Sequence, residues 1–284
     1  DITLSYPETL SADVVKAIVR IKDDIWKKDH LSDEFPNTLL RSDVLQLLEK
    51  YCTVIYYPLD EQSNNGFHIT GIPDKNGTLK HFVFLNTNQT IEKQAFTAAH
   101  ELGHIWQIDQ YVSKTCNVAL TPELTEQIMN RFAAEVLIPK EQFVLYFENK
   151  IKDYMTVDRH ITKYNLLRVI VSLMWDFFAP RKAIILRGFE TGFFSDSLTN
   201  NLLQSNENTE NTVKSLIVEM GYSAFQVPSR RKWINGLGEL LDEAESKNSV
   251  TPQKIDSMRE KFNLHTIKAD ESIKEESLSL EKGC

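Results

Sequence analysis

The chain has 284 residues, of which 42% are apolar and 10% aromatic, so it can bury the core of one large domain or two small ones. Its 32 Lys and Arg residues against 40 Asp and Glu residues give a formal net charge of -8. An acidic balance opposes non-specific binding to phosphate backbones, so no direct binding of nucleic acid is expected. The short basic run at Arg230, Arg231 and Lys232 is interpreted as a solvated turn.

The cysteine content and the hydropathy of the sequence indicate where in the cell the protein is located. Cys52, Cys116 and Cys284 are widely spaced and contain no CxxC pair, which argues against a disulfide framework and against a thiolate metal site. We therefore predict a reducing, cytoplasmic location. No apolar run approaches the roughly 18 residues of a membrane span, and no membrane association is expected. Because the sequence begins at Asp1 rather than Met, a removed signal peptide stays an open alternative.

Apolar residues at helical spacing predict two helices near the N-terminus, at 11–28 and 42–51. Three β-like stretches follow at 52–57, 67–72 and 81–85, separated by turns rich in Gly, Asn and Asp. A small antiparallel sheet is the simplest arrangement of these strands. Further helices are predicted at 90–110, 122–137, 140–152, 165–178 and 180–187.

The second half of the chain suggests a domain boundary. Residues 195–212 are rich in Ser, Asn and Thr, which is typical of a linker or a long loop. We therefore predict a first domain at 1–195 and a helical region at 196–267, for which a regulatory or recognition role is expected. Residues 268–284 are charged and lack aromatic residues, so this tail is expected to be disordered.

The segment HELGH at 100–104 is an HExxH motif inside the helix predicted at 90–110. In an α-helix, residues four apart lie about 40° apart around the axis and one turn along it. His100 and His104 therefore project from one face and can bind a single zinc ion. Glu101 lies beside them and is the candidate catalytic base.

A catalytic zinc site commonly has three protein ligands and leaves the fourth position to water, whose pKa falls towards about 7. Beyond the two histidines, Glu126 in the next predicted helix can supply the third ligand. Asn130 lies one turn after Glu126, where it can hydrogen-bond the free ring nitrogen of a ligating histidine. HExxH followed by ExxxN is the ligand pattern of thermolysin-like peptidases. We predict one Zn²⁺ ion, bound by His100, His104 and Glu126.

Two other carboxylates, Glu123 and Glu135, are rival third ligands, because the loop before their helix decides which side chain faces the metal. Glu126 is preferred for its partner Asn130. Tyr154 and His160 lie downstream and are alternatives for stabilising a transition-state oxyanion, but neither is assigned that role. The remaining histidines show no ligand spacing and are interpreted as surface or core residues: His30, His68, His81 and His265.

Two segments of the sequence resemble the ImmA/IrrE metallopeptidases. The first is FTAAHELGH at 96–104, and the second is NRFAAEVLIP at 130–139. A predicted strand ending in Leu85-Asn86 precedes both, as is usual in that family. The resemblance is strongest across 82–139.

The resemblance covers residues 10–195, and the chain beyond them matches no family pattern. It departs from the family at Met129, where Ala is usual, and at Ile138, where Met is usual. Neither residue is a proposed ligand. The resemblance implies an α+β fold in which a small antiparallel sheet packs on a zincin-like helical core, followed by a mostly helical C-terminal region.

The resemblance also implies an intracellular zinc metallo-endopeptidase that hydrolyses a flexible segment of a regulatory protein such as a transcriptional repressor. Glu101 is expected to accept the proton of the attacking water and to pass it to the leaving amine. If residues 81–86 form an edge strand, the substrate can add to it as an extended strand. Two alternatives remain: a non-catalytic zinc-containing binding or sensor module, and a broad-specificity peptidase.

Overall fold

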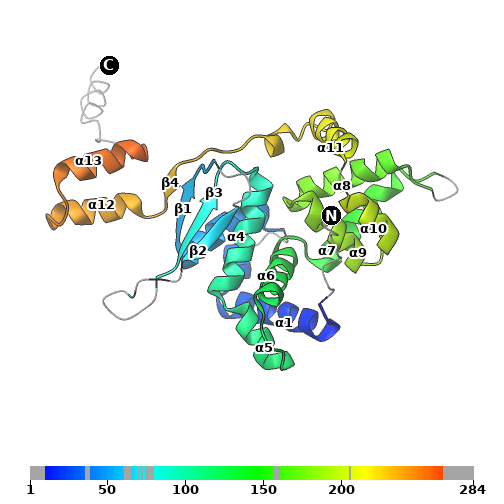
Figure 1. Cartoon of the computed structure of the whole chain (residues 1–284), viewed down its shortest axis with the longest axis horizontal. Coiled ribbons are helices and arrows are strands. Elements are labelled where there is room, and N and C mark those ends of the chain that lie inside the picture. The colour runs from blue at the N-terminus through cyan, green and yellow to red at the C-terminus, as the bar shows by residue number, and fades with distance from the viewer. Residues whose placement is uncertain are drawn as a thin grey trace, which may run out of the picture. The chain divides into compact units, whose positions relative to one another are not determined.

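The computed structural model describes residues 10–35, 39–60, 65–69, 71, 73, 80–156, 160–204 and 206–264. The chain divides into two compact units, Asp1–Lys232 and Trp233–Cys284. The described residues combine many helices with a small sheet (Figure 1), which confirms the expected α+β class.

The first unit contains the sheet and most of the helices. Its strands are β1 (Thr53–Tyr57), β2 (Gly66–Ile69) and β3 (Phe82–Asn86). Its α-helices are α1 (Ala12–Lys28), α2 (Leu31–Glu34), α3 (Val44–Tyr51), α4 (Ile91–Ile105), α5 (Ile108–Cys116), α6 (Pro122–Leu137), α7 (Lys140–Lys152), α8 (Lys163–Phe177), α9 (Arg181–Glu190), α10 (Asp196–Leu203) and α11 (Glu207–Glu219). Two short 3-10 helices are η1 (Arg41–Asp43) and η2 (Ser223–Gln226).

The sheet of the first unit is mixed, which corrects the prediction of an antiparallel sheet. Its strands lie in the order β2-β3-β1, with β3 antiparallel to β2 and parallel to β1. The reason is that β3, rather than β2, lies beside β1. Because β3 is central, residues 81–86 are not the predicted edge strand. Among the strands described in the first unit, β2 is the outer one beside β3.

The two faces of this sheet differ, because side chains alternate along each strand. The inner face consists of fully buried side chains: Val54, Tyr56, Val83 and Leu85. Helix α4 packs against β2 and β3, and α3 packs against β1. On the other face, Phe67 is 40% exposed and its ring stacks on that of Phe84 at a centroid distance of 5.1 Å.

Helix α4 is held close to its neighbours by glycines. A Cβ atom at Gly103 would lie 2.7 Å from Sδ of Met129 and 3.1 Å from Cδ1 of Phe132, both on α6. A Cβ atom at Gly66 in β2 would lie 2.8 Å from Cγ2 of Thr97 on α4. The absence of side chains at these two positions therefore lets α6 and β2 approach α4 closely.

The single helix predicted at 90–110 is two helices. Gln107 has a left-handed backbone with φ +53°, and it separates α4 from α5. By contrast, α6 has the predicted bounds. Thr121 caps its first turn by accepting a hydrogen bond from the Leu124 amide at 3.2 Å, and Pro122 follows at the first helical position.

A buried ion-pair network joins α6 to α9. Arg187 of α9 is 1% exposed, and its guanidinium lies 3.2 Å from the carboxylate of Glu135 and 2.8 Å from that of Glu190. Arg131, one turn before Glu135 on α6, lies 2.8 Å from the same carboxylate. Because all these charges have partners, the network can be buried without leaving an isolated ion.

The segment 195–212, predicted to be a linker or a long loop, contains α10 and the first part of α11 instead. Its polar residues are helix caps: the Ser195 hydroxyl accepts a hydrogen bond from the Leu198 amide at 3.3 Å, and the Asn206 side chain accepts one from Thr209 at 2.9 Å. Ser and Asn are favourable at such positions as well as in loops, which explains the misreading.

The compact unit continues past residue 195, where the sequence predicted a domain boundary. Helix α10 packs on α9, and α11 packs on α8. Arg181 lies 2.5 Å from Glu210, and Arg168 lies 2.6 Å from Glu219. The structure divides the chain after Lys232 instead.

The basic run at 230–232 is exposed, as predicted for a solvated turn, but its backbone is anchored. The Arg230 amide donates to the carbonyl of Thr87 at 3.0 Å, and the Thr87 hydroxyl donates to the carbonyl of Arg231 at 2.8 Å. The Arg231 guanidinium lies 4.9 Å from the centre of the Tyr56 ring. These contacts hold the end of the first unit against the sheet and the loop after β3.

The second unit contains β4 (Trp233–Ile234), α12 (Leu237–Ser246) and α13 (Pro252–Lys261). Its small core consists of Leu237, Leu241, Ile255 and Phe262. The disorder predicted for 268–284 falls outside the described residues. Among the described helices, none combines the length and the apolar content that a bilayer crossing requires.

Replacing Gly103 with Val is expected to push α4 and α6 apart, because its side chain would overlap Met129 and Phe132. Overpacking of this kind costs about 1–3 kcal/mol of unfolding free energy. Urea unfolding would measure the loss. A variant that keeps wild-type stability would show that the two helices are not held by this contact.

Replacing Glu135 with Gln should lower the unfolding free energy by about 3 kcal/mol, because it leaves Arg187 buried without its main anionic partner. Burial alone would raise the pKa of Glu135, but Arg187 and Arg131 outweigh it and bring that pKa below its ordinary value. The ion pairs of Glu135 therefore stabilise the fold fully at pH values above the ordinary pKa of a glutamate. This stabilisation is lost as the pH falls through the folded-state pKa of Glu135. Urea unfolding from about pH 7 to about pH 3 should show the gap between variant and wild type shrinking in acid. A gap independent of pH would contradict this account.

Candidate metal centre

The two histidines of the HExxH motif lie together on α4. Their ring centroids are 5.0 Å apart, and the Nε2 atoms of His100 and His104 are separated by 3.2 Å. Both side chains are mostly buried, with 15% and 24% exposure respectively. The one-turn spacing therefore places the two Nε2 atoms next to each other, as the sequence predicted.

Glu126 reaches the same point from α6. Its carboxylate oxygens lie 3.3 Å from Nε2 of His100 and 3.7 Å from Nε2 of His104. The ligand atoms of these three residues all lie within 4.8 Å of one another, and no other such group occurs among the described residues. The structure thus brings the three predicted ligands together.

Asn130 orients one of the histidines. Its Oδ1 atom lies 3.1 Å from Nδ1 of His100, so the ring donates its Nδ1–H to the amide oxygen. The proton on Nδ1 leaves Nε2 of His100 with a lone pair that faces Glu126. Burial, followed by the neighbouring His104, lowers the pKa of His100, which favours the neutral ring that ligates metals.

These residues fit a zinc ion. Two donors at about 2.0–2.1 Å from a tetrahedral zinc lie roughly 3.3 Å apart, and the two Nε2 atoms are 3.2 Å apart. Two imidazoles and one carboxylate are a common catalytic donor set for zinc. The Glu126 side chain is 58% exposed, so the fourth side of the group is open to solvent and substrate.

The two rival ligands lie elsewhere. Glu123 is exposed, and hydrogen bonds from its own backbone and from Thr121 lower its pKa. Glu135 is nine residues after Glu126, which places it about 180° away around the helix. That opposite face carries the buried ion pair with Arg187.

Glu101 is buried, with 5% exposure, beside the ligand group. Burial, together with the negative charge of Glu126, raises the pKa of Glu101 to about 7. A carboxyl group with a pKa near neutrality can both accept and return a proton at working pH. Glu101 also contributes to the raised pKa of the Cys52 thiol, which burial mainly causes, so this cysteine is not an activated nucleophile.

Sequence reasoning missed the position of His68 and His81. The rings of His68 and His104 have centroids 6.4 Å apart, and Nε2 of His68 lies 2.9 Å from Nδ1 of His81. The alternation of side chains along β2 and β3 could have placed His68 and His81 on one face. It could not have placed that face beside His104.

The two oxyanion alternatives are not seen at the site. His160 is exposed, and its amide donates to the Thr156 hydroxyl at 3.1 Å. Tyr154 follows the end of α7, where its amide donates to the Ile151 carbonyl at 3.0 Å. Within the described part of the chain, neither side chain shows a hydrogen bond, ion pair or ring contact with the three candidate ligands.

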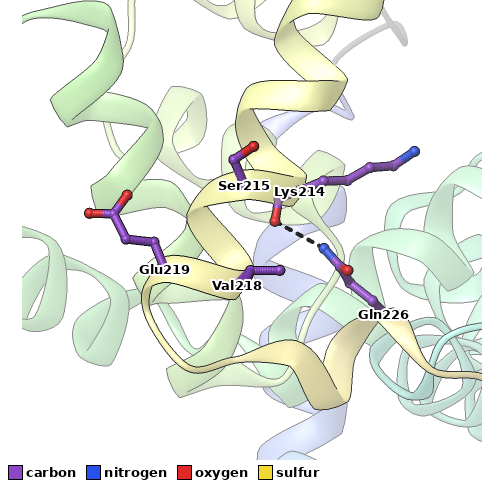
Figure 2. Close-up of a pocket in the computed structure, with 5 residues that line it drawn as sticks. All are labelled: Lys214, Ser215, Val218, Glu219 and Gln226. Carbon is purple, nitrogen blue, oxygen red and sulfur yellow. Dashed lines mark hydrogen bonds between the residues drawn. The ribbon is translucent and has the colours of Figure 1, made fainter.

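A surface depression of about 500 Å³ is lined by residues of α11 and η2, and none of the candidate site residues lines it. Figure 2 shows Gln226 donating a hydrogen bond to the backbone carbonyl of Lys214, at 3.0 Å, while Glu219 points away. Glu219 instead accepts hydrogen bonds from Tyr164 and Arg168 of α8. Because no reactive groups converge in this depression, it is not the functional site.

Comparison with known proteins places the site in a family. Residues 49–177 match the family model Peptidase_M78, described as the IrrE N-terminal-like domain. The matched segment contains the HExxH helix, Glu126 and Asn130. A search of curated proteins found no match. Residues 49–177 are thus an IrrE N-terminal-like domain, and this part of the chain belongs to the ImmA/IrrE metallopeptidases.

Proposed function

We propose that the chain is a zinc endopeptidase whose metal is bound by His100, His104 and Glu126. The observation that carries this proposal is the convergence of three ligand atoms within 4.8 Å of one another, next to a buried carboxyl group that is not among them. A structural zinc site needs no such acid or base and usually has four protein ligands.

A zinc ion in this site supplies Lewis acidity towards a peptide carbonyl and an attacking water. Glu101 accepts the proton of that water and returns it to the departing amine, so the reaction consumes no acid or base overall. Asn130 keeps His100 in the ligating tautomer. No side-chain nucleophile takes part, and no covalent intermediate with the protein is expected.

We further propose that the substrate is a flexible segment of a regulatory protein, such as a transcriptional repressor, inside the cell. The resemblance to the ImmA/IrrE family supports this choice. The outer strand β2 also supports an extended substrate, because a peptide can add to it beside His104. A folded substrate core could not present such a strand.

A non-catalytic zinc sensor is the main competing function, and a broad-specificity peptidase is another. The buried Glu101 beside the ligands favours an enzyme over a sensor. Cleavage of one defined segment, rather than of many unrelated peptides, would favour the dedicated enzyme over the broad one.

Replacing Glu126 with Ala should abolish stoichiometric zinc binding, because only two ligands remain. Elemental analysis of protein purified without added metal, and titration of metal-free protein with zinc, would measure it. The matched control is Glu123→Ala, three residues earlier on the same helix, which should keep wild-type affinity. Full zinc content in Glu126→Ala would remove Glu126 from the ligand set.

Replacing Glu101 with Gln should leave zinc content and folding unchanged but lower peptide cleavage by at least about a hundredfold, because the general base is lost. Mass spectrometry of products from a mixed library of flexible peptides would measure cleavage. If wild type binds zinc but cleaves no more than Glu101→Gln, the sensor function replaces the peptidase function.

A further inference from the structure

His68 lies on the inner face of the outer strand β2. In the antiparallel register, Gly66 faces Leu85 and His68 faces Val83. Residues directly opposite each other in such a pair share one face of the sheet. Since Val83 and Leu85 are fully buried under the helices, His68 points to the side of the sheet that α4 covers.

The path of β2 along α4 brings His68 to the metal ligands. Gly66 lies against Thr97, and His104 follows Thr97 by two helical turns on nearly the same face. Two residues after Gly66, the ring of His68 lies 6.4 Å from that of His104, with 29° between the ring planes. The two histidines on α4 are therefore approached by Glu126 from α6 and by His68 from β2.

His81 fixes the orientation of this ring. Its Nδ1 atom lies 2.9 Å from Nε2 of His68, and the carbonyl of His81 accepts a hydrogen bond from the Thr53 amide at 3.0 Å. Across the described residues, His68 shows no other side-chain hydrogen bond, and it is only half-buried. Its second ring nitrogen, Nδ1, is thus available to a ligand.

We propose that His68 is a substrate-contacting residue, which donates a hydrogen bond from Nδ1–H to a carbonyl oxygen of the peptide at the metal centre. His81 is the positioning residue: its Nδ1–H donates to Nε2 of His68 and so leaves the proton of His68 on Nδ1. This inference rests on the proposed function, and it adds a residue on the β2 side of the site.

The chemistry of the site favours a donor at this place. Negative charge develops on the carbonyl oxygen during attack, and hydrogen-bond donors aimed at it stabilise the transition state. Glu101 and Glu126 cannot donate when ionised. Among the described residues, His68 is a neutral side chain that can donate and that lies beside His104 on the β2 side of the site.

Binding of acetohydroxamate to the cobalt-substituted protein tests the proposal without a known substrate. Cobalt(II) accepts the zinc ligands, and its visible absorption reports both the metal geometry and the bound hydroxamate. We expect His68→Leu to raise the dissociation constant about tenfold, because a hydrogen bond to a charged oxygen is lost. His68→Gln retains a donor and should recover most of the affinity.

Two further variants separate the roles. Ile69→Thr changes the neighbouring residue on the opposite face of β2, which is 52% exposed, and should bind acetohydroxamate like wild type. His81→Phe should weaken binding severalfold, because His68 loses its orienting partner. Thermal unfolding of each variant without metal checks that the fold is intact.

Each outcome decides the inference. Unchanged hydroxamate affinity in His68→Leu would overturn it, and so would equal losses in His68→Leu and His68→Gln. A changed cobalt spectrum in ligand-free His68→Leu would also overturn it, since His68 would then organise the metal rather than the substrate. If wild type fails to bind cobalt or zinc, the proposed function itself fails, and the inference falls with it.

Discussion

The close approach of α4 and α6 is the constraint on which the site depends. The two candidate histidine ligands and the candidate base lie on α4, whereas the candidate third ligand Glu126 and its partner Asn130 lie on α6. A carboxylate side chain spans only a few ångströms, so α6 must lie close to α4 for Glu126 to reach the two histidines. Gly103 allows this, because its missing side chain makes room for Met129 and Phe132.

Helix α6 has two separate polar faces. One carries Glu126 and Asn130 at the candidate metal centre, and the opposite one carries Glu135 in a buried ion pair with Arg187. Apolar side chains between them, including Phe132 and Ile128, are fully buried. The position of Glu126 is therefore determined on both sides of its helix, by contact with α4 and by ion pairing with α9.

Much of the site could be predicted from the sequence, because its signals are local. Helical spacing places His100 beside His104, and the cap at Thr121 with Pro122 begins α6 at the predicted residue. The position of His68 could not be predicted, because it depends on how a strand lies across a helix. The mixed sheet was missed for the same reason, since the order of strands is set by tertiary packing. Residues 196–267 were predicted to be helical, but the stretch 195–212 was interpreted as a linker because cap residues and linker residues have the same composition.

The Glu135–Arg187 pair also bears on how much of the chain is needed for an independent folding unit. The family match ends at residue 177, but Arg187 and Glu190 lie after it. A fragment cut at the end of the match would keep Glu135 and Arg131 on α6 and expose a surface that α9 normally covers. An autonomous fragment therefore needs at least α9 as well, and a boundary drawn at the end of the family match would cut through the packed core.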